Sequence, residues 1–178
     1  MIKKIFIKHV IGFLVGIGIF VIVIPSGLYL LHQSFVWNLF SSSVVDNRLL
    51  IGISSFLLFL GLFFVIWSNI LLVFKGKGGP TEGLGISISP KTKNLVIKGP
   101  YRFTRNPMVF GMLSIYSSIV LFLNSLIGLI VVVVIATVAI IYLKISEERR
   151  LLKDFGDEFV QYRQNVSMIV PFPKRLIS

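Results

Sequence analysis

Residues 49–74 form a run of 26 residues without a single charged side chain. About 20 apolar residues in an α-helix are enough to cross the hydrocarbon core of a bilayer. A run of 26 residues therefore spans it with length to spare for tilting. Such a run lacks the polar face that a surface helix of a soluble domain needs. It predicts a membrane-spanning helix and sets the class of the whole chain.

The composition of the remaining chain agrees with this class. Of the 178 residues, 55% are hydrophobic and 14% are charged, whereas about 25% charged residues are typical of a soluble domain. A second apolar run covers residues 10–31 and lacks a small-residue cleavage site, so it favours a retained span over a signal peptide. Pro25 within this run predicts a bend.

Two shorter apolar runs follow further along, residues 108–123 and residues 126–143. Only Asn124 and Ser125 separate them, which predicts a tight turn and an antiparallel helical hairpin. After the hairpin, residues 146–164 are rich in charge and predict an amphipathic helix. Its apolar face consists of Leu151, Phe155, Phe159 and Tyr162.

The predicted fold class is therefore all-α and integral to the membrane. We expect about four transmembrane helices, the last two forming the short hairpin, and a C-terminal helix that Gly156 divides. Residues 1–74 are predicted to hold the two N-terminal transmembrane helices. Residues 75–178 are predicted to form a second unit that contains a polar connection, the hairpin and the C-terminal helix.

The net charge of +11 reflects how lysine and arginine are distributed. Three precede the first span, one lies between the first two spans, seven fall within residues 75–105, and seven follow from Lys144 onward. With four crossings, 17 of the 18 share one side, and the positive-inside rule makes that side cytoplasmic together with both termini. Topology accounts for the basic excess, so no nucleic-acid partner is predicted. With no cysteine and two well-separated histidines, no metal site is predicted either.

The polar connection, residues 75–105, is long enough to indicate a functional or a disordered segment. Within it, residues 95–97 are apolar and fit either a short strand or a wall for a flat ligand. The connection leads into residues 99–107, Gly-Pro-Tyr-Arg-Phe-Thr-Arg-Asn-Pro. Gly99 and Pro100 predict a turn, and Pro107 predicts the first position of a helix, whose free N–H groups would suit an anion.

The hairpin brings its two outer ends together, so Glu147 and Glu148 are expected near Arg102 and Arg105. Two interpretations follow from the residues alone. One is a set of surface salt bridges, each worth about 0–1 kcal/mol. The other is a charged pocket at the membrane border.

These motifs together resemble the isoprenylcysteine carboxyl methyltransferase family, which is similar in turn to membrane phospholipid N-methyltransferases. The family pattern is Gly-x-Tyr, Arg-His-Pro-x-Tyr-x-Gly, an apolar hairpin, Glu-Glu-x-x-Leu, Phe-Gly-x-x-Tyr-x-x-Tyr and a late proline. The resemblance covers residues 95–171, and the first two spans carry none of it. The matching positions are residues 99–107, Gly111, Glu147, Glu148, Leu152, Phe155, Gly156, Phe159, Tyr162, Arg163, Val166 and Pro171.

The resemblance implies methyl transfer from S-adenosyl-L-methionine to a lipid-like or isoprenylated acceptor in the bilayer, at a carboxylate or a headgroup. It places the cofactor on the cytoplasmic side, covered by the polar connection. The implied catalytic residues are Arg105 and Glu148. The implied cofactor-binding residues are Lys93, Asn94, Leu95, Val96, Tyr101, Asn106, Pro107, Met108, Val109 and Glu147.

Two positions depart from the family pattern. Asn106 stands where the family usually has histidine, and Val109 where an aromatic residue is common. An asparagine amide forms hydrogen bonds, but it does not titrate near neutral pH. The departure bears on any proton transfer at Asn106 more than on cofactor binding.

Two other classes of function stay open. A membrane reductase of sterol-reductase-like architecture would bind NADPH, with Arg102 and Arg105 at its 2′-phosphate. A scaffold or small transporter is the third class, which the charge-free spans disfavour. The identity of the acceptor, O- against N-methylation and the oligomeric state are left open.

Overall fold

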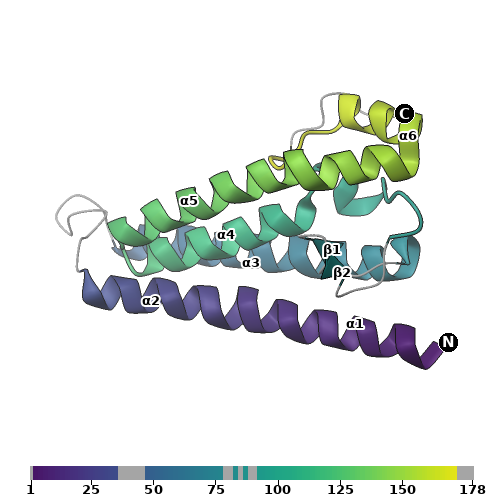
Figure 1. Cartoon of the computed structure of the whole chain (residues 1–178). Helices are drawn as coiled ribbons and strands as arrows, with labels where there is room; N and C mark the ends of the chain where they lie inside the picture. The colour runs from purple at the N-terminus through teal and green to yellow at the C-terminus, as the bar shows by residue number, and fades with distance from the viewer. Residues whose placement is uncertain (1, 36–46, 78–81, 84–85, 88–91, 172–178) are drawn as a thin grey trace.

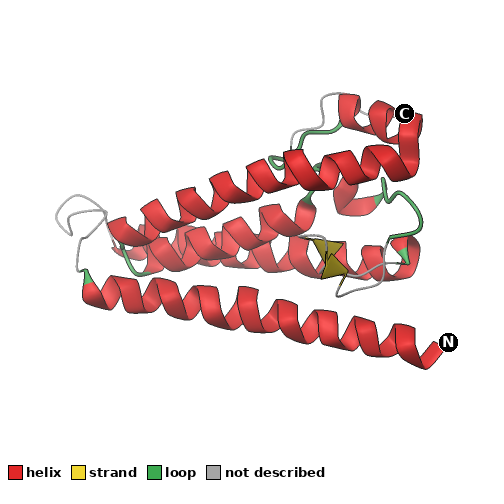
Figure 2. Cartoon of the chain, in the orientation of Figure 1, coloured by secondary structure: helices red, strands yellow, loops and turns green. Residues whose placement is uncertain are grey.

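In the computed structural model, the described residues are 2–35, 47–77, 82–83, 86–87 and 92–171. Helices dominate this part of the chain (Figure 2). The α-helices are α1 (Ile2–Gly16), α2 (Ile24–Ser34), α3 (Asn47–Leu71), α4 (Pro107–Phe122), α5 (Leu126–Tyr142) and α6 (Glu148–Asn165). The other elements are the π-helical η1 (Ile17–Val23), η2 (Leu72–Gly76) and η4 (Leu143–Glu147), the 3-10 helix η3 (Gly99–Arg102), and the strands β1 (Glu82–Gly83) and β2 (Ile86–Ser87).

The long helices lie side by side as a bundle (Figure 1). Three helical stretches of the described chain are long and apolar enough to cross a membrane, at Val10–Ser34, Arg48–Gly76 and Leu126–Asn165. The helix Pro107–Phe122 is also apolar but shorter. The predicted all-α membrane fold is therefore confirmed. The start of α1 and the whole of α6 lie at one end of the bundle, which we call the polar end (Figure 1).

The first helical stretch, which consists of α1, η1 and α2, continues through Pro25, and the π-helical η1 ends two residues before this proline. In η1 the N–H of Ile24 donates to the carbonyl of Ile19. Pro25 has no N–H to offer. The carbonyl of Phe20 thereby loses its helical donors, and the hydroxyl of Tyr116 in α4 donates to it over 2.9 Å. The irregularity that proline imposes thus ties the first stretch to α4.

Helices α3 and α4 approach each other at the level of their backbones. A Cβ atom on Gly61 would lie 2.6 Å from the carbonyl oxygen of Gly111, and one on Gly111 would lie 2.7 Å from that of Gly61. Further along, Ser118 Oγ donates to the carbonyl of Ser54 over 2.7 Å. Helices in hydrocarbon associate through such small-residue contacts and interhelical hydrogen bonds. This contact gives a structural reason for Gly111 of the sequence motif.

The predicted hairpin is confirmed, with α4 and α5 as its arms. Asn124 adopts a left-handed conformation with φ of 50°. Ser125 caps α5, because its Oγ accepts a hydrogen bond from the N–H of Gly128 over 3.1 Å. The core beside the hairpin is formed by Leu28, Tyr116, Val120 and Val132.

At the polar end, α5 passes through η4 into α6 without a break. Gly156 divides α6 as predicted, because its φ of 51° and ψ of −126° are not helical. The second half of α6 and the residue that follows it contribute a buried cluster of Phe159, Tyr162 and Val166, which we call the aromatic cluster after its two rings. Leu95 and Ile97 pack against this cluster and residues 95–97 form no strand, while their role as a wall for a ligand stays a prediction.

Strands β1 and β2 lie in the polar connection and pair antiparallel, with Glu82 opposite Ser87 and Gly83 opposite Ile86. Residues 78–81, 84–85 and 88–91 of the connection lie outside the described residues, as do Met1 and residues 172–178. The prediction that the connection covers a cofactor falls partly on these residues and stays a prediction.

Candidate active site

Arg105 and Glu148 meet at the polar end. Arg105 Nη1 lies 2.5 Å from Glu148 Oε1, and their side chains are 10% and 14% exposed. Arg163 Nη1 lies 3.6 Å from the other carboxylate oxygen of Glu148. Surface salt bridges are solvated on most sides, whereas this pair is largely removed from water. The structure therefore favours the charged-pocket interpretation for Arg105, while Arg102 in η3 is exposed.

Arg105 is held at this place by the backbone of the C-terminal segment. Its N–H donates to the carbonyl of Ser167 over 2.9 Å. Thr104 and Ser167 form a parallel β-bridge beside that bond. On the other side of the pair, Glu148 is the first residue of α6. Three segments far apart in the sequence are thus needed to build one ion pair.

Asn106 has a partner within the protein. Its Nδ2 donates to the carbonyl of Met168 over 2.9 Å, and Thr104 Oγ1 donates to the same carbonyl over 3.1 Å. The backbone N–H of Asn106 donates to Thr104 Oγ1 over 3.2 Å. Asn106 lies just before α4 as expected, but its amide N–H group is engaged in fixing the C-terminal segment.

The Arg105–Glu148 pair lies in the wall of a pocket of about 530 Å³. This volume is within the range of small-molecule sites, about 300–1,000 Å³. The lining combines three cationic side chains, one carboxylate, one amide and two apolar side chains: Arg105, Lys144, Arg163, Glu148, Gln164, Ile140 and Met168. We call this space the charged pocket.

The electrostatics of the charged pocket suit a ligand that carries an anionic group. Burial lowers the pKa of Arg105, and the negative charge of Glu148 acts in the opposite direction. An arginine guanidinium nevertheless stays protonated in proteins. Within the described chain, Arg105 Nε is buried and has no hydrogen-bond acceptor. A carboxylate or phosphate oxygen would satisfy such a donor.

Tyr101 in η3 lies close enough to Glu147 in η4 for the charge of Glu147 to act on its hydroxyl group. The carbonyl of Tyr101 accepts a hydrogen bond from Tyr162 Oη over 2.7 Å. Glu147 Oε1 pairs with Arg150 Nη2 over 2.6 Å. Desolvation, with a smaller contribution from the charge of Glu147, raises the pKa of Tyr101 well above its ordinary value. Tyr101 is therefore a neutral hydroxyl group at physiological pH.

The predicted residues Lys93 and Asn94 anchor the connection to η2, which continues α3. The N–H of Lys93 donates to the carbonyl of Gly76 over 2.8 Å, and Asn94 Nδ2 donates to the carbonyl of Lys75 over 3.0 Å. Val96 is buried, while Leu95 faces the aromatic cluster.

The start of α4 contains the last three predicted residues. Pro107 is buried at the first turn, Val109 is partly buried, and Met108 lines a different pocket. Of the residues predicted for the site, the structure thus brings Arg105 and Glu148 into the charged pocket, and none of the others lines it in the part of the chain that the structure describes.

Five residues of the charged pocket were not predicted for it: Ile140, Lys144, Arg163, Gln164 and Met168. A signal for two of them was present, because Ile140, Lys144 and Glu148 are spaced four residues apart along one helical stretch. Met168 carries no comparable signal, since only the pairing of the C-terminal segment with Thr104 brings it there.

These features define a class, namely a helical membrane protein with a pocket lined by charged side chains at one end of its bundle. A family model described as phospholipid methyltransferase matches residues 48–158, more than half of the chain. The chain belongs to the phospholipid methyltransferase family, which confirms the resemblance found in the sequence and implies a membrane methyltransferase acting on lipids. Neither the curated proteins nor the solved structures that were compared gave a match.

The matched region runs from the start of α3 to just beyond Gly156. It includes both partners of the Arg105–Glu148 pair and both glycines of the α3–α4 contact. The first helical stretch precedes the match.

Proposed function

We propose that the protein transfers a methyl group from S-adenosyl-L-methionine to the polar part of a membrane lipid, with the donor bound in the charged pocket. The family match supports methyl transfer to a lipid. The observation that carries the site is the largely dehydrated Arg105–Glu148 pair in the wall of a pocket of about 530 Å³. The alternative of an NADPH-dependent reductase has no comparable support, because the matching family transfers methyl groups.

The residues of the charged pocket fit the chemical groups of this methyl donor. Its carboxylate suits the buried Nε of Arg105, which has no acceptor among the described residues. Its ammonium group or ribose hydroxyls suit the carboxylate of Glu148. Ile140 and Met168 offer apolar surface to a flat base.

The donor, when bound, supplies a methyl group on a positively charged sulfur. In-line transfer requires that the protein align the acceptor and exclude water. An amine acceptor must first lose a proton, whereas a carboxylate acceptor need not. Glu148 is the carboxylate in the pocket that can take such a proton. Arg105 and Arg163 hold it in one orientation.

None of the other predicted residues lines the charged pocket among the described residues, and we propose that they support the segments that build it. Tyr101 accepts a hydrogen bond from Tyr162, Glu147 pairs with Arg150, and Lys93 and Asn94 bind the backbone of η2. Asn106 is the N-cap of α4, and residues 107–109 belong to its first turn. The excess of basic residues at the polar end supports a cytoplasmic orientation of that end and of both termini.

The proposal is tested by incubating the purified full-length protein with a membrane lipid extract and isotopically labelled S-adenosyl-L-methionine. We expect labelled methyl groups in the lipid fraction and loss of labelling in Arg105→Gln. The matched control is Arg102→Gln, which removes an exposed arginine three residues away and should label lipids as the wild type does. Stabilisation by NADPH alone, without any lipid labelling, would assign the pocket to a reductase instead.

A further inference from the structure

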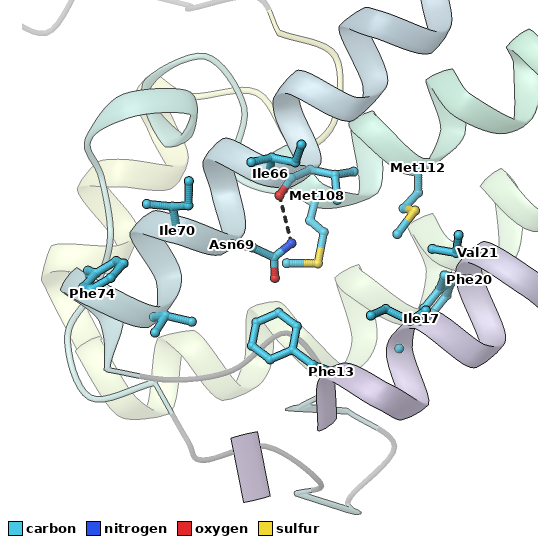
Figure 3. Close-up of a pocket in the computed structure, with 13 residues that line it drawn as sticks. Phe13, Ile17, Phe20, Val21, Ile66, Asn69, Ile70, Phe74, Met108 and Met112 are labelled. Carbon is cyan, nitrogen blue, oxygen red and sulfur yellow. Dashed lines mark hydrogen bonds between the residues drawn. The ribbon is translucent and has the colours of Figure 1, made fainter. Parts of the chain in front are cut away.

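A second pocket, of about 480 Å³, lies between the first helical stretch and helices α3 and α4 (Figure 3). Its wall is apolar over most of its extent. Phe13 and Phe20 contribute from the first stretch, Ile66 and Ile70 from α3, and Met108 and Met112 from α4. Among the described residues, no side chain lines both this apolar pocket and the charged pocket.

One polar side chain, Asn69 of α3, belongs to the lining of the apolar pocket. Asn69 Nδ2 donates to the carbonyl of Val65 over 2.8 Å. A carbonyl oxygen can only accept, so the amide nitrogen must face Val65 and Oδ1 must face the other way. Within the described chain, Oδ1 is buried without a hydrogen-bond partner. Figure 3 shows it directed into the pocket, between Met108 and Phe13.

The apolar pocket opens sideways, onto the surface that faces hydrocarbon. Val21, Ile66 and Phe74 line it and are 55%, 57% and 76% exposed, and all three belong to helical stretches suited to cross a membrane. In a bilayer, lipid chains rather than water therefore reach the opening. Lipid chains can pack against the apolar wall of the pocket, but they offer no hydrogen-bond donor to Asn69 Oδ1.

The position of Asn69 along α3 indicates which part of a lipid could supply that donor. Asn69 lies six residues before Lys75, the first charge after the span. Six helical residues rise about 9 Å, so with Lys75 among the headgroups Oδ1 lies near their border with the hydrocarbon. This is the depth at which the backbone of a lipid joins its head to its chains.

We propose that the apolar pocket binds the hydrocarbon chain of a membrane amphiphile that carries a hydroxyl group next to the chain, and that this hydroxyl donates to Asn69 Oδ1. A buried amide oxygen in an apolar site strongly favours a ligand that can donate to it. Asn69 is then a specificity residue that distinguishes amphiphiles with a free hydroxyl from those in which the hydroxyl is blocked.

The apolar pocket also adjoins the start of α4. Met108, in its wall, is the third residue after Arg105 of the charged pocket. If the proposed methyl transfer is correct, the bound amphiphile belongs to the class from which the acceptor comes, and this assignment rests on the proposed function. Binding of the amphiphile does not depend on it and can be measured without a methyl donor.

The proposal is tested with two probe lipids that differ in one functional group. One is an octadecyl lysophosphocholine with a free glycerol hydroxyl, and the other is its methyl ether at that hydroxyl. Each is titrated against the purified full-length protein in detergent, and bound lipid is counted by native mass spectrometry. We expect the wild type to bind the free hydroxyl about five- to tenfold more tightly than the ether, as one buried hydrogen bond predicts.

The variant Asn69→Leu should bind both probes equally, while remaining folded because leucine suits an apolar helix. The matched control is Thr137→Val on α5, which also loses a side-chain bond to the carbonyl four residues earlier, but outside the pocket. It should keep the wild-type preference. Equal binding of both probes by the wild type, an unchanged preference in Asn69→Leu, or a protein dimer in place of bound lipid would each overturn the proposal. Failure of methyl transfer with the preference intact would overturn only the proposed function.

Discussion

The bundle and the polar end of this protein are stabilised in different ways. In the bundle, α3 and α4 touch through Gly61 and Gly111, and single hydrogen bonds cross between helices, as from Ser118 to Ser54. At the polar end, the aromatic cluster of Phe159, Tyr162 and Val166 is buried against residues of the connection. Hydrocarbon provides no hydrophobic force between helices, so close contact has to hold the bundle. Water surrounds the polar end, where burying aromatic surface is itself stabilising.

This difference also predicts which substitutions affect folding and which affect the candidate site. Substitutions in the bundle should act on folding of the membrane part, whereas substitutions at the polar end should act on the shape of the charged pocket. The following predictions test this division.

The largest effect is expected for Phe159→Ala. Phe159 is 1% exposed in the aromatic cluster, and replacing a buried phenylalanine by alanine costs about 3–5 kcal/mol. We expect the polar end to loosen while the bundle stays folded. Hydrogen exchange should rise in residues 92–106 and 148–171 and stay unchanged in α3. The control Phe122→Ala removes a ring that is 65% exposed and should change neither region.

The next largest effect is expected for Gly111→Leu. A side chain at Gly111 would collide with the carbonyl of Gly61 and the side chain of Val65. Overpacking of this kind costs about 1–3 kcal/mol, or more where backbone must move. The yield of monodisperse folded protein and its melting temperature should both fall.

A leucine at Gly52, also in α3, provides the control, since a Cβ there meets no atom within 4 Å. Equal destabilisation by Gly52→Leu and Gly111→Leu would show that the close contact between α3 and α4 does not hold the bundle.

A smaller effect is expected for Tyr116→Phe. This change removes the hydroxyl that donates to the carbonyl of Phe20 and leaves that carbonyl without its donor from α4. The free energy of unfolding, measured by thermal unfolding, should fall by about 1 kcal/mol. Tyr29→Phe is the control, because its hydroxyl pairs with Gln33 on the exposed side of α2. If both variants melt alike, the π-helical segment does not tie the first stretch to the hairpin.

Much of the fold could be predicted from the sequence because its signals are local. Long apolar runs mark the spans, Pro107 marks the start of α4, and Gly156 marks the kink in α6. The hairpin turn at Asn124 and Ser125 also brought the two ends of the charged pair together in the prediction. Local signals did not show the π-helical segments: η1 precedes Pro25, but η2 and η4 contain no proline.

The candidate site was predictable only in part, for a physical reason. Arg105 and Glu148 flank the hairpin, so topology alone brings them together. The pairing of Thr104 and Asn106 with Met168 depends on where the C-terminal segment returns, and the sequence holds no sign of it. For that reason the engagement of the Asn106 amide by Met168 could not be foreseen. The roles of the other predicted site residues stay predictions.

Binding of the demethylated donor, S-adenosylhomocysteine, to purified protein is the most direct test of the central claim. Calorimetry should show binding to the wild type, and Glu148→Gln should weaken it at least about tenfold, since a charged hydrogen bond contributes roughly 1.5–3 kcal/mol. Glu158→Gln, which alters an exposed carboxylate on the same helix, should bind as the wild type does. Wild-type affinity in Glu148→Gln, or the same loss in both variants, would contradict a donor site in the charged pocket.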